Sequence, residues 1–208
     1  MVGLAANESS ASAYLAAEGS RLAVAADGAL AAVVEPRRVV IVELASAAPI
    51  AEVGLDGAAE DTDVAWVGPP SRLLVVARGA SHSSVHLIDP LGAGGPQQVA
   101  QIRIEASMRI RAAVGPYALA IGARSAAVLV AGEAQVTPYQ FPARGLPTVA
   151  GAAARQFVVA VAGAIEEWDP QARIPKRRLR LPRAAAITAL GGSERLFWVT
   201  TQQDPSRI

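Results

Sequence analysis

The chain has 208 residues, of which 52% are hydrophobic, and its formal net charge at pH 7 is +1. This length allows one sizeable domain or two small ones, and the near-zero charge gives no general attraction to nucleic acid or to a membrane surface. Because there is no cysteine, neither a disulfide framework nor a thiolate zinc site can form.

The sequence also lacks the apolar segments that membrane insertion or secretion requires. No apolar run reaches the roughly 18 residues of a membrane helix, and the longest, 112–123, is interrupted by Gly115 and Pro116. The N-terminus has neither the basic nor the continuous apolar region of a secretory signal. We therefore predict a cytoplasmic protein. Abundant alanine, with Lys176 as the only lysine among 19 basic residues, suggests a GC-rich bacterial source.

Short runs rich in Val, Ile, Leu and Ala recur along the chain between Gly, Pro, Asp and Ser, which is typical of strands joined by turns. The predicted strands are 21–25, 30–35, 38–44, 50–55, 63–68, 72–78, 84–89, 98–104, 110–115, 117–123, 126–132, 134–141, 148–153, 156–162, 164–169, 173–181, 186–190 and 195–201. No segment has a sustained helical period with caps, although the alanine-rich N-terminus could hold one short helix.

The predicted strands fall into groups of four, and the second strand of each group is the most apolar. These second strands begin "AAVV" at Ala31, "LLVV" at Leu73, "ALAI" at Ala118, "FVVA" at Phe157 and "LFWV" at Leu196. A period of about 40 residues with four strands per unit is the pattern of a propeller blade. The second strand of a blade is covered on both faces, so a continuously apolar sequence is expected there.

The turn after the third strand supports the same architecture. "EEWDP" ends the third strand of the fourth group at Asp169 and Pro170, and "HLIDP" ends that of the second group at Asp89 and Pro90. An aspartate there can accept hydrogen bonds from the turn, and a proline stops strand pairing. Between residues 21 and 201 the chain thus resembles the WD-repeat and related propeller families, although the Gly-His pair usual at the start of a WD-repeat blade is absent.

We therefore predict an all-β fold, a β-propeller of four-stranded antiparallel blades with four complete repeats and a partial fifth. Residues 1–18 form an N-terminal lead, and residues 19–208 form the propeller domain. Two closures remain open at this point. Residues 11–17 could add a ring-closing strand to a small five-bladed ring, or the chain could be part of a larger propeller.

The main candidate site is the basic run "RIPKRRLRLPR" at 173–183, which would be the outermost strand of the fourth blade. Strand alternation predicts Lys176, Arg178 and Arg180 on one face, with Arg177, Leu179 and Leu181 on the other. One interpretation is that the cations protect an exposed sheet edge. The other is contact with an acidic protein or with nucleic acid phosphate. No aromatic residue lies between the cations to stack a base, so we do not expect RNA recognition.

A second candidate surface is the face of the propeller that carries the loops between blades. The loop that enters the second blade carries Asp56, Glu60, Asp61 and Asp63, and equivalent loops carry Glu105 and Arg144. The loops between second and third strands on the same face carry Arg37, His82 and Arg124. These charges are either ordinary solvated loop residues or a recognition surface of mixed charge.

Metal chemistry has little support in the sequence. His82 and His86 lie four residues apart where a turn enters a strand, and four strand residues span roughly 13 Å, too far for both to hold one ion. We predict no metal site and no cofactor.

The function that we predict is a non-enzymatic platform for binding another protein. The alternative is binding or hydrolysis of a small ligand in the central tunnel. Propeller hydrolases and lactonases hold a metal there with Asn, Asp, Glu and His, but this chain has a single Asn and two His, so only carboxylates could serve. A third interpretation is a domain whose function depends on segments outside this sequence.

Overall fold

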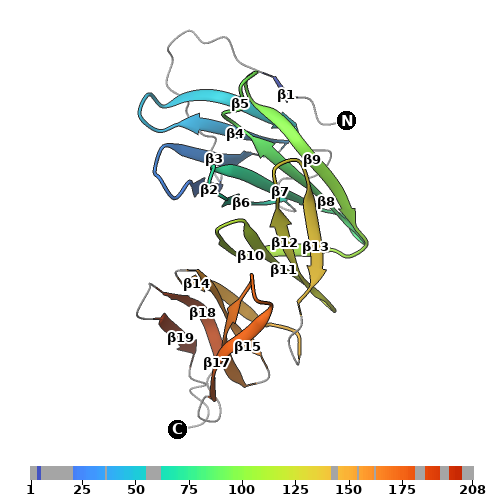
Figure 1. Cartoon of the computed structure of the whole chain (residues 1–208), viewed down its shortest axis with the longest axis vertical. Coiled ribbons are helices and arrows are strands. Elements are labelled where there is room, and N and C mark those ends of the chain that lie inside the picture. The colour runs from blue at the N-terminus through green and yellow to red at the C-terminus, as the bar shows by residue number, and fades with distance from the viewer. Residues whose placement is uncertain are drawn as a thin grey trace. The chain divides into compact units, whose positions relative to one another are not determined.

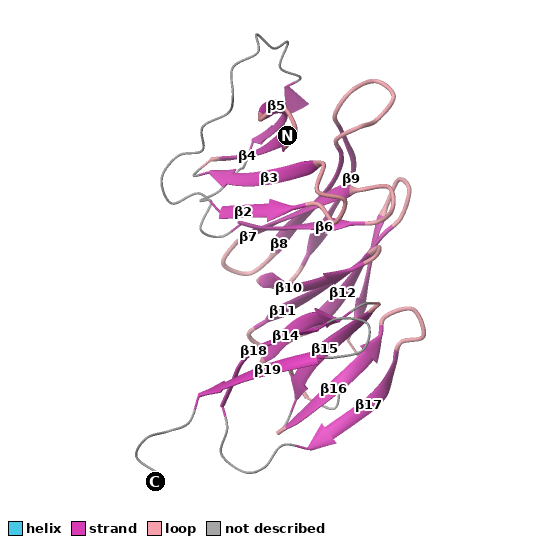
Figure 2. Ribbon diagram, turned by 90° about the vertical axis from the view of Figure 1, so that its left-hand side faces the viewer, coloured by secondary structure: helices cyan, strands magenta, loops and turns pink. Residues whose placement is uncertain are grey.

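The computed structural model describes residues 4–5, 21–35, 37–54, 62–141, 145–153, 155–161, 163–180, 186–192 and 197–202, and it describes side chains only between residues 21 and 180. Every regular element in this part of the chain is a β-strand, as Figure 2 shows. The described residues include no helix that is long and apolar enough to cross a membrane.

The chain divides into two compact units, Met1–Arg109 with Ala131–Thr137 and Ile110–Val130 with Pro138–Ile208. The first unit holds two antiparallel sheets, labelled in Figure 1. Their strands are β1 (Leu4–Ala5), β2 (Arg21–Val24), β3 (Leu30–Glu35), β4 (Arg38–Glu43) and β5 (Ala48–Gly54) in one sheet, and β6 (Thr62–Val67), β7 (Arg72–Arg78), β8 (Ser83–Asp89) and β9 (Gln97–Ile104) in the other. The strand orders are β1-β5-β4-β3-β2 and β6-β7-β8-β9.

The core of the first unit lies between these two sheets. Val34, Ile41 and Val53 project from one sheet onto Leu73 and Val75 of the other, and all are buried. Six consecutive residues of β3 are buried, as expected for a strand with neighbours on both faces. In this unit the second strands, β3 and β7, are therefore inner strands with largely buried side chains, as their apolar sequences predicted.

The second unit repeats this arrangement. It contains β11 (Tyr117–Gly122) and most of β10 (Met108–Val114), β12 (Ala126–Ala131) and β13 (Val136–Gln140), in the order β10-β11-β12-β13. Its other sheet has the order β17-β16-β15-β14-β18-β19, built from β14 (Val149–Ala153), β15 (Gln156–Val161), β16 (Ala164–Asp169), β17 (Ile174–Arg180), β18 (Ala186–Gly192) and β19 (Phe197–Gln202). Leu119, Phe157 and Trp168 are among the buried residues of the core that these sheets share.

Three blades contain the same irregularity, at the second-last residue of the third strand. The pairing register shifts between Ile41 and Val42, between Leu87 and Ile88, and between Glu167 and Trp168. In each case the fourth strand carries one extra residue, and in the last blade that residue is Lys176. Such a bulge bends the outer strand and interrupts the alternation of its side chains.

The two ends of the described chain both extend sheets already present. β1 pairs antiparallel with β5, the outer strand of the first blade. At the other end, β18 lies parallel to β14 through Ala153 and Gly192, and β19 pairs antiparallel with β18. The predicted organisation of four four-stranded antiparallel blades and a partial fifth is thus confirmed, while residues 11–17 and any N-terminal helix lie outside the described residues.

Candidate interaction surface

The turn that leads into β17 is held by the aspartate that the sequence singled out. The Asp169 carboxylate accepts hydrogen bonds from the backbone N–H of Gln171 at 2.9 Å and of Ala172 at 3.0 Å. Asp89 accepts an equivalent bond from Leu91 at 3.1 Å in the second blade. The predicted turn-stabilising role of both aspartates is confirmed.

A contact that the sequence did not indicate fixes the same turn to β13. The Tyr139 hydroxyl donates to the carbonyl of Pro170 at 2.7 Å, and the guanidinium of Arg173 lies 4.3 Å from the centre of the tyrosine ring. Burial raises the pKa of Tyr139 to about 12, so the phenol stays a hydrogen-bond donor at neutral pH. No local pattern pairs residues 34 positions apart, which is why this anchor could not be predicted.

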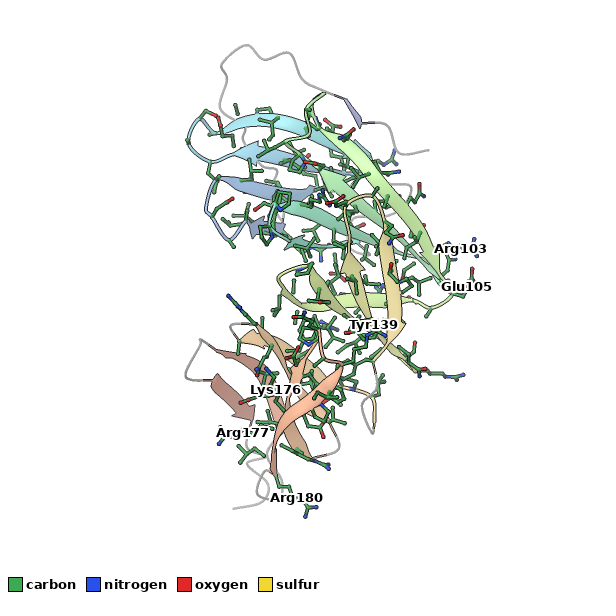
Figure 3. The ribbon with its side chains drawn as sticks, in the orientation of Figure 1. Arg103, Glu105, Tyr139, Lys176, Arg177 and Arg180 are labelled. Atoms are coloured by element: carbon green, nitrogen blue, oxygen red, sulfur yellow. The ribbon has the colours of Figure 1, made fainter. Side chains whose placement is uncertain are left out.

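β17 is the outermost strand of its blade, and each of its seven residues is exposed. Among them are two aliphatic side chains, Ile174 at 54% and Leu179 at 42% exposure. The outer strand of the second blade, β9, also carries charge, but its exposed Arg103 and the adjoining Glu105 neutralise each other at 2.7 Å. Figure 3 labels this pair together with Lys176, Arg177 and Arg180 along β17.

Two of the four cations in β17 are paired within the blade. Lys176 Nζ lies 2.9 Å from the Asp169 carboxylate, and this bond is the first cause that lowers the pKa of Asp169. Arg178 Nε lies 3.3 Å from the buried carboxylate of Glu166, which also accepts a bond from the Trp168 indole at 3.0 Å.

The other two cations, Arg177 and Arg180, make no ion pair with any described residue. They stand opposite Glu167 and Ala164 in the register of the sheet. Their guanidinium groups are therefore the charges of β17 that could bind an anionic group of another molecule.

The bulge corrects the predicted distribution of these cations over the two faces. Lys176 pairs with Asp169, whereas Arg178 pairs with Glu166, and these two acids lie on opposite faces of β16 because they are three residues apart. The prediction that Lys176 shares a face with Arg178 and Arg180 was therefore wrong, whereas Arg178 and Arg180, two residues apart in an unbroken register, do lie on one face. The prediction assumed unbroken alternation, which the extra residue at Lys176 interrupts.

Of the loop charges predicted as a second surface, residues 56, 60, 61 and 144 fall outside the described residues. Among the described ones, Glu105 pairs with its neighbour Arg103 on β9. Asp63 is in β6 and pairs with Arg21 of β2 at 3.3 Å. Arg21 also donates to the carbonyl of Thr62. Asp63 thus links two strands of the first unit.

The histidines have separate surroundings. His86 is buried in β8, with Nδ1 2.9 Å from the Gln98 side-chain oxygen, while His82 lies in the turn before that strand. Within the described ranges, no three His, Asp or Glu side chains gather closely enough to hold a metal ion.

Comparison with known proteins identifies the fold. No protein-family model and no curated protein matches the sequence. The β-propeller domain of Cps50 (Swd1) from Myceliophteria thermophila is similar, with a TM-score of 0.63 at 16% identity over 87% of this chain and 62% of that chain. The WD40 domain of SCAP from fission yeast gives a TM-score of 0.58 at 11% identity, over 82% and 47% respectively.

A third similar chain comes from the S. cerevisiae complex of Dbp5 bound to Nup159, Gle1, IP6 and ADP. It has a TM-score of 0.57 at 12% identity and covers 90% of this chain and 53% of that one. The present chain thus spans between 47% and 62% of the length of these three proteins. At such low identities the likeness establishes the fold, a β-propeller that resembles the WD-repeat proteins.

Proposed function

We propose that this β-propeller is a non-enzymatic platform that binds another protein, and that β17 is a contact surface. The observation that carries the proposal is the chemistry of that strand. It presents two guanidinium groups without an ion pair to any described residue and two exposed aliphatic side chains. The sheet fixes the backbone that carries these four side chains, so little backbone entropy is lost when a partner binds.

The proposal requires no bond to be made or broken. The blades present side chains at fixed positions, and the partner supplies complementary carboxylates and apolar contacts. A chain of similar fold occurs in the complex of Dbp5 with Nup159, which supports protein partners for propellers in general. We place the platform in the cytoplasm, as the absence of cysteine suggests.

The test is a pull-down from nuclease-treated lysate of the source organism. The variant Arg177→Glu/Arg180→Glu reverses the two cations that have no described ion partner and leaves the Lys176–Asp169 and Arg178–Glu166 pairs in place. The matched control, Arg111→Glu/Arg124→Glu, makes the same charge change at two other exposed arginines that have no ion pair to a described residue. Thermal unfolding of each variant checks that the fold is retained.

A protein captured by the wild type and the control, and lost from the β17 variant, is the expected result. Equal capture by all three would assign the contact to another surface and contradict the role of β17. A parallel pull-down from untreated lysate completes the test. Capture from the untreated lysate alone would show that nucleic acid mediates the contact, which would also contradict the proposal.

A further inference from the structure

The outer edge of β17 is a free strand edge. β17 is the last strand in the order of its sheet and pairs only with β16 among the described strands. In an antiparallel sheet, alternate residues of an edge strand direct their N–H and C=O groups away from the neighbour. From Arg177 to Arg180 the register is unbroken, so this four-residue stretch offers a regular edge beyond Pro175 and the bulge at Lys176.

The first blade already carries an added strand at the equivalent edge. The bulges align the outer strands of the two blades, so that Ala51, Glu52, Val53 and Gly54 correspond to Arg177, Arg178, Leu179 and Arg180. β1 pairs antiparallel there, with Leu4 opposite Val53 and Ala5 opposite Glu52. The curvature of this blade edge is therefore compatible with a further strand. In β1 the residues at the two central positions are an apolar one, Leu4, and a small one, Ala5.

The side chains of β17 specify what such a strand should contain. Acidic residues in the added strand, opposite Arg177 and Arg180, would form ion pairs with them, because neither arginine has an ion partner among the described residues. An apolar residue opposite Leu179 would cover this side chain, which is 42% exposed. Arg178 is held by the buried Glu166 and needs no charge opposite it.

A peptide fits these features better than a nucleic acid does. Phosphate binding draws on many cations, yet only two of those in β17 are without a described ion partner, and the net charge of the chain is +1. The aliphatic Ile174 and Leu179 match apolar side chains, and β17 has no aromatic residue on which a base could stack.

We propose that residues Arg177–Arg180 bind an extended acidic segment of the protein partner as an additional antiparallel strand. The inference rests on the protein-binding function proposed above. Because the added strand runs opposite to β17, its sequence from N to C is acidic, apolar, small and acidic, facing Arg180, Leu179, Arg178 and Arg177 in turn. Backbone hydrogen bonds supply affinity, and the two ion pairs select the acidic segment.

The probe that tests the pairing is the fluorescent peptide TTELAETT, with binding to the full chain measured by anisotropy. We expect it to bind at least about tenfold more tightly than TTKLAKTT. The variant Arg177→Glu/Arg180→Glu should reverse this preference, while Arg111→Glu/Arg124→Glu should retain it. Two further peptides are N-methylated, one on the leucine amide and one on the alanine amide. In an added strand only alternate amides donate hydrogen bonds to β17, so one of these two peptides should lose binding and the other should keep it.

The outcomes separate this inference from the function on which it rests. Strand addition is overturned if both N-methylated peptides bind as tightly as the parent peptide. It is also overturned if single-stranded oligo-dT displaces the peptide when phosphate and carboxylate groups are at equal concentration. A partner captured through Arg177 and Arg180 in the pull-down would then still support the platform. If no peptide binds and no partner depends on these residues, both proposals are overturned.

Discussion

At the scale of single residues, Asp169 combines two roles that a neutral side chain can only partly replace. Its carboxylate closes the turn through two backbone N–H groups and pairs with Lys176 at 2.9 Å. The Lys176 bond is the largest cause that lowers the pKa of Asp169. An asparagine at this position would keep an acceptor for the turn and lose the ion pair, so D169N isolates the charge.

We expect D169N to lower the free energy of unfolding at neutral pH by up to about 1 kcal/mol, because the pair is partly solvent-screened. The folded-state pKa lies below the unfolded value, so the charged form stabilises the fold above about pH 4, and this contribution is lost as the pH falls through the folded-state pKa. Urea unfolding of both proteins from pH 7 to pH 3 should show their difference shrinking in acid. A difference that is constant over this range would mean that the carboxylate charge does not stabilise the turn.

At the scale of strands, one sheet contains both extremes of burial. Phe157 in β15 is fully buried against Trp168 and Phe141 in the core of the second unit, whereas Leu179 in β17 is 42% exposed. We expect F157A to cost about 3–5 kcal/mol of unfolding free energy, since it leaves a cavity. L179A should cost less than about 0.5 kcal/mol, because it removes little buried area. Chemical unfolding followed by tryptophan fluorescence measures both.

A large cost for L179A would show that β17 is covered in solution, and would remove the free edge on which strand addition depends. A small cost for F157A would mean that the second unit is not packed around β15. Near-ultraviolet circular dichroism of each variant provides the control, because it reports whether the aromatic environment of the core is retained before denaturant is added.

The strands themselves could be predicted because their signals are local. The predicted strands 72–78 and 164–169 coincide with β7 and β16, and Asp89 and Asp169 stabilise turns as their position at the end of a third strand indicates. The bulge at Lys176 could not be predicted, because an extra residue changes the register without changing composition or turn residues. The Tyr139–Arg173 contact depends on how two hairpins lie in space, which no local period encodes.

At the scale of the whole molecule, the free edges of the sheets are protected to different degrees. β17 has cations, Pro175 and a bulge, all of which disfavour pairing with an unselected strand. β2, at the edge of the first sheet, exposes Leu22 at 64% and Val24 at 49%. These two stand opposite the buried Val33 and Ala31, so the apolar face of the sheet continues to an edge strand on which both side chains are exposed.

We therefore expect self-association at high concentration to proceed through β2, and L22K/V24K to reduce it. The double variant should unfold at nearly the wild-type denaturant concentration, because neither side chain is buried. Sedimentation velocity over a concentration series measures the effect. The control is L44K/L91K, which adds the same charge at exposed leucines in turns rather than on an edge strand. If the control reduces association as strongly as L22K/V24K, the added charge by itself lowers association. Association through the β2 edge would then be contradicted.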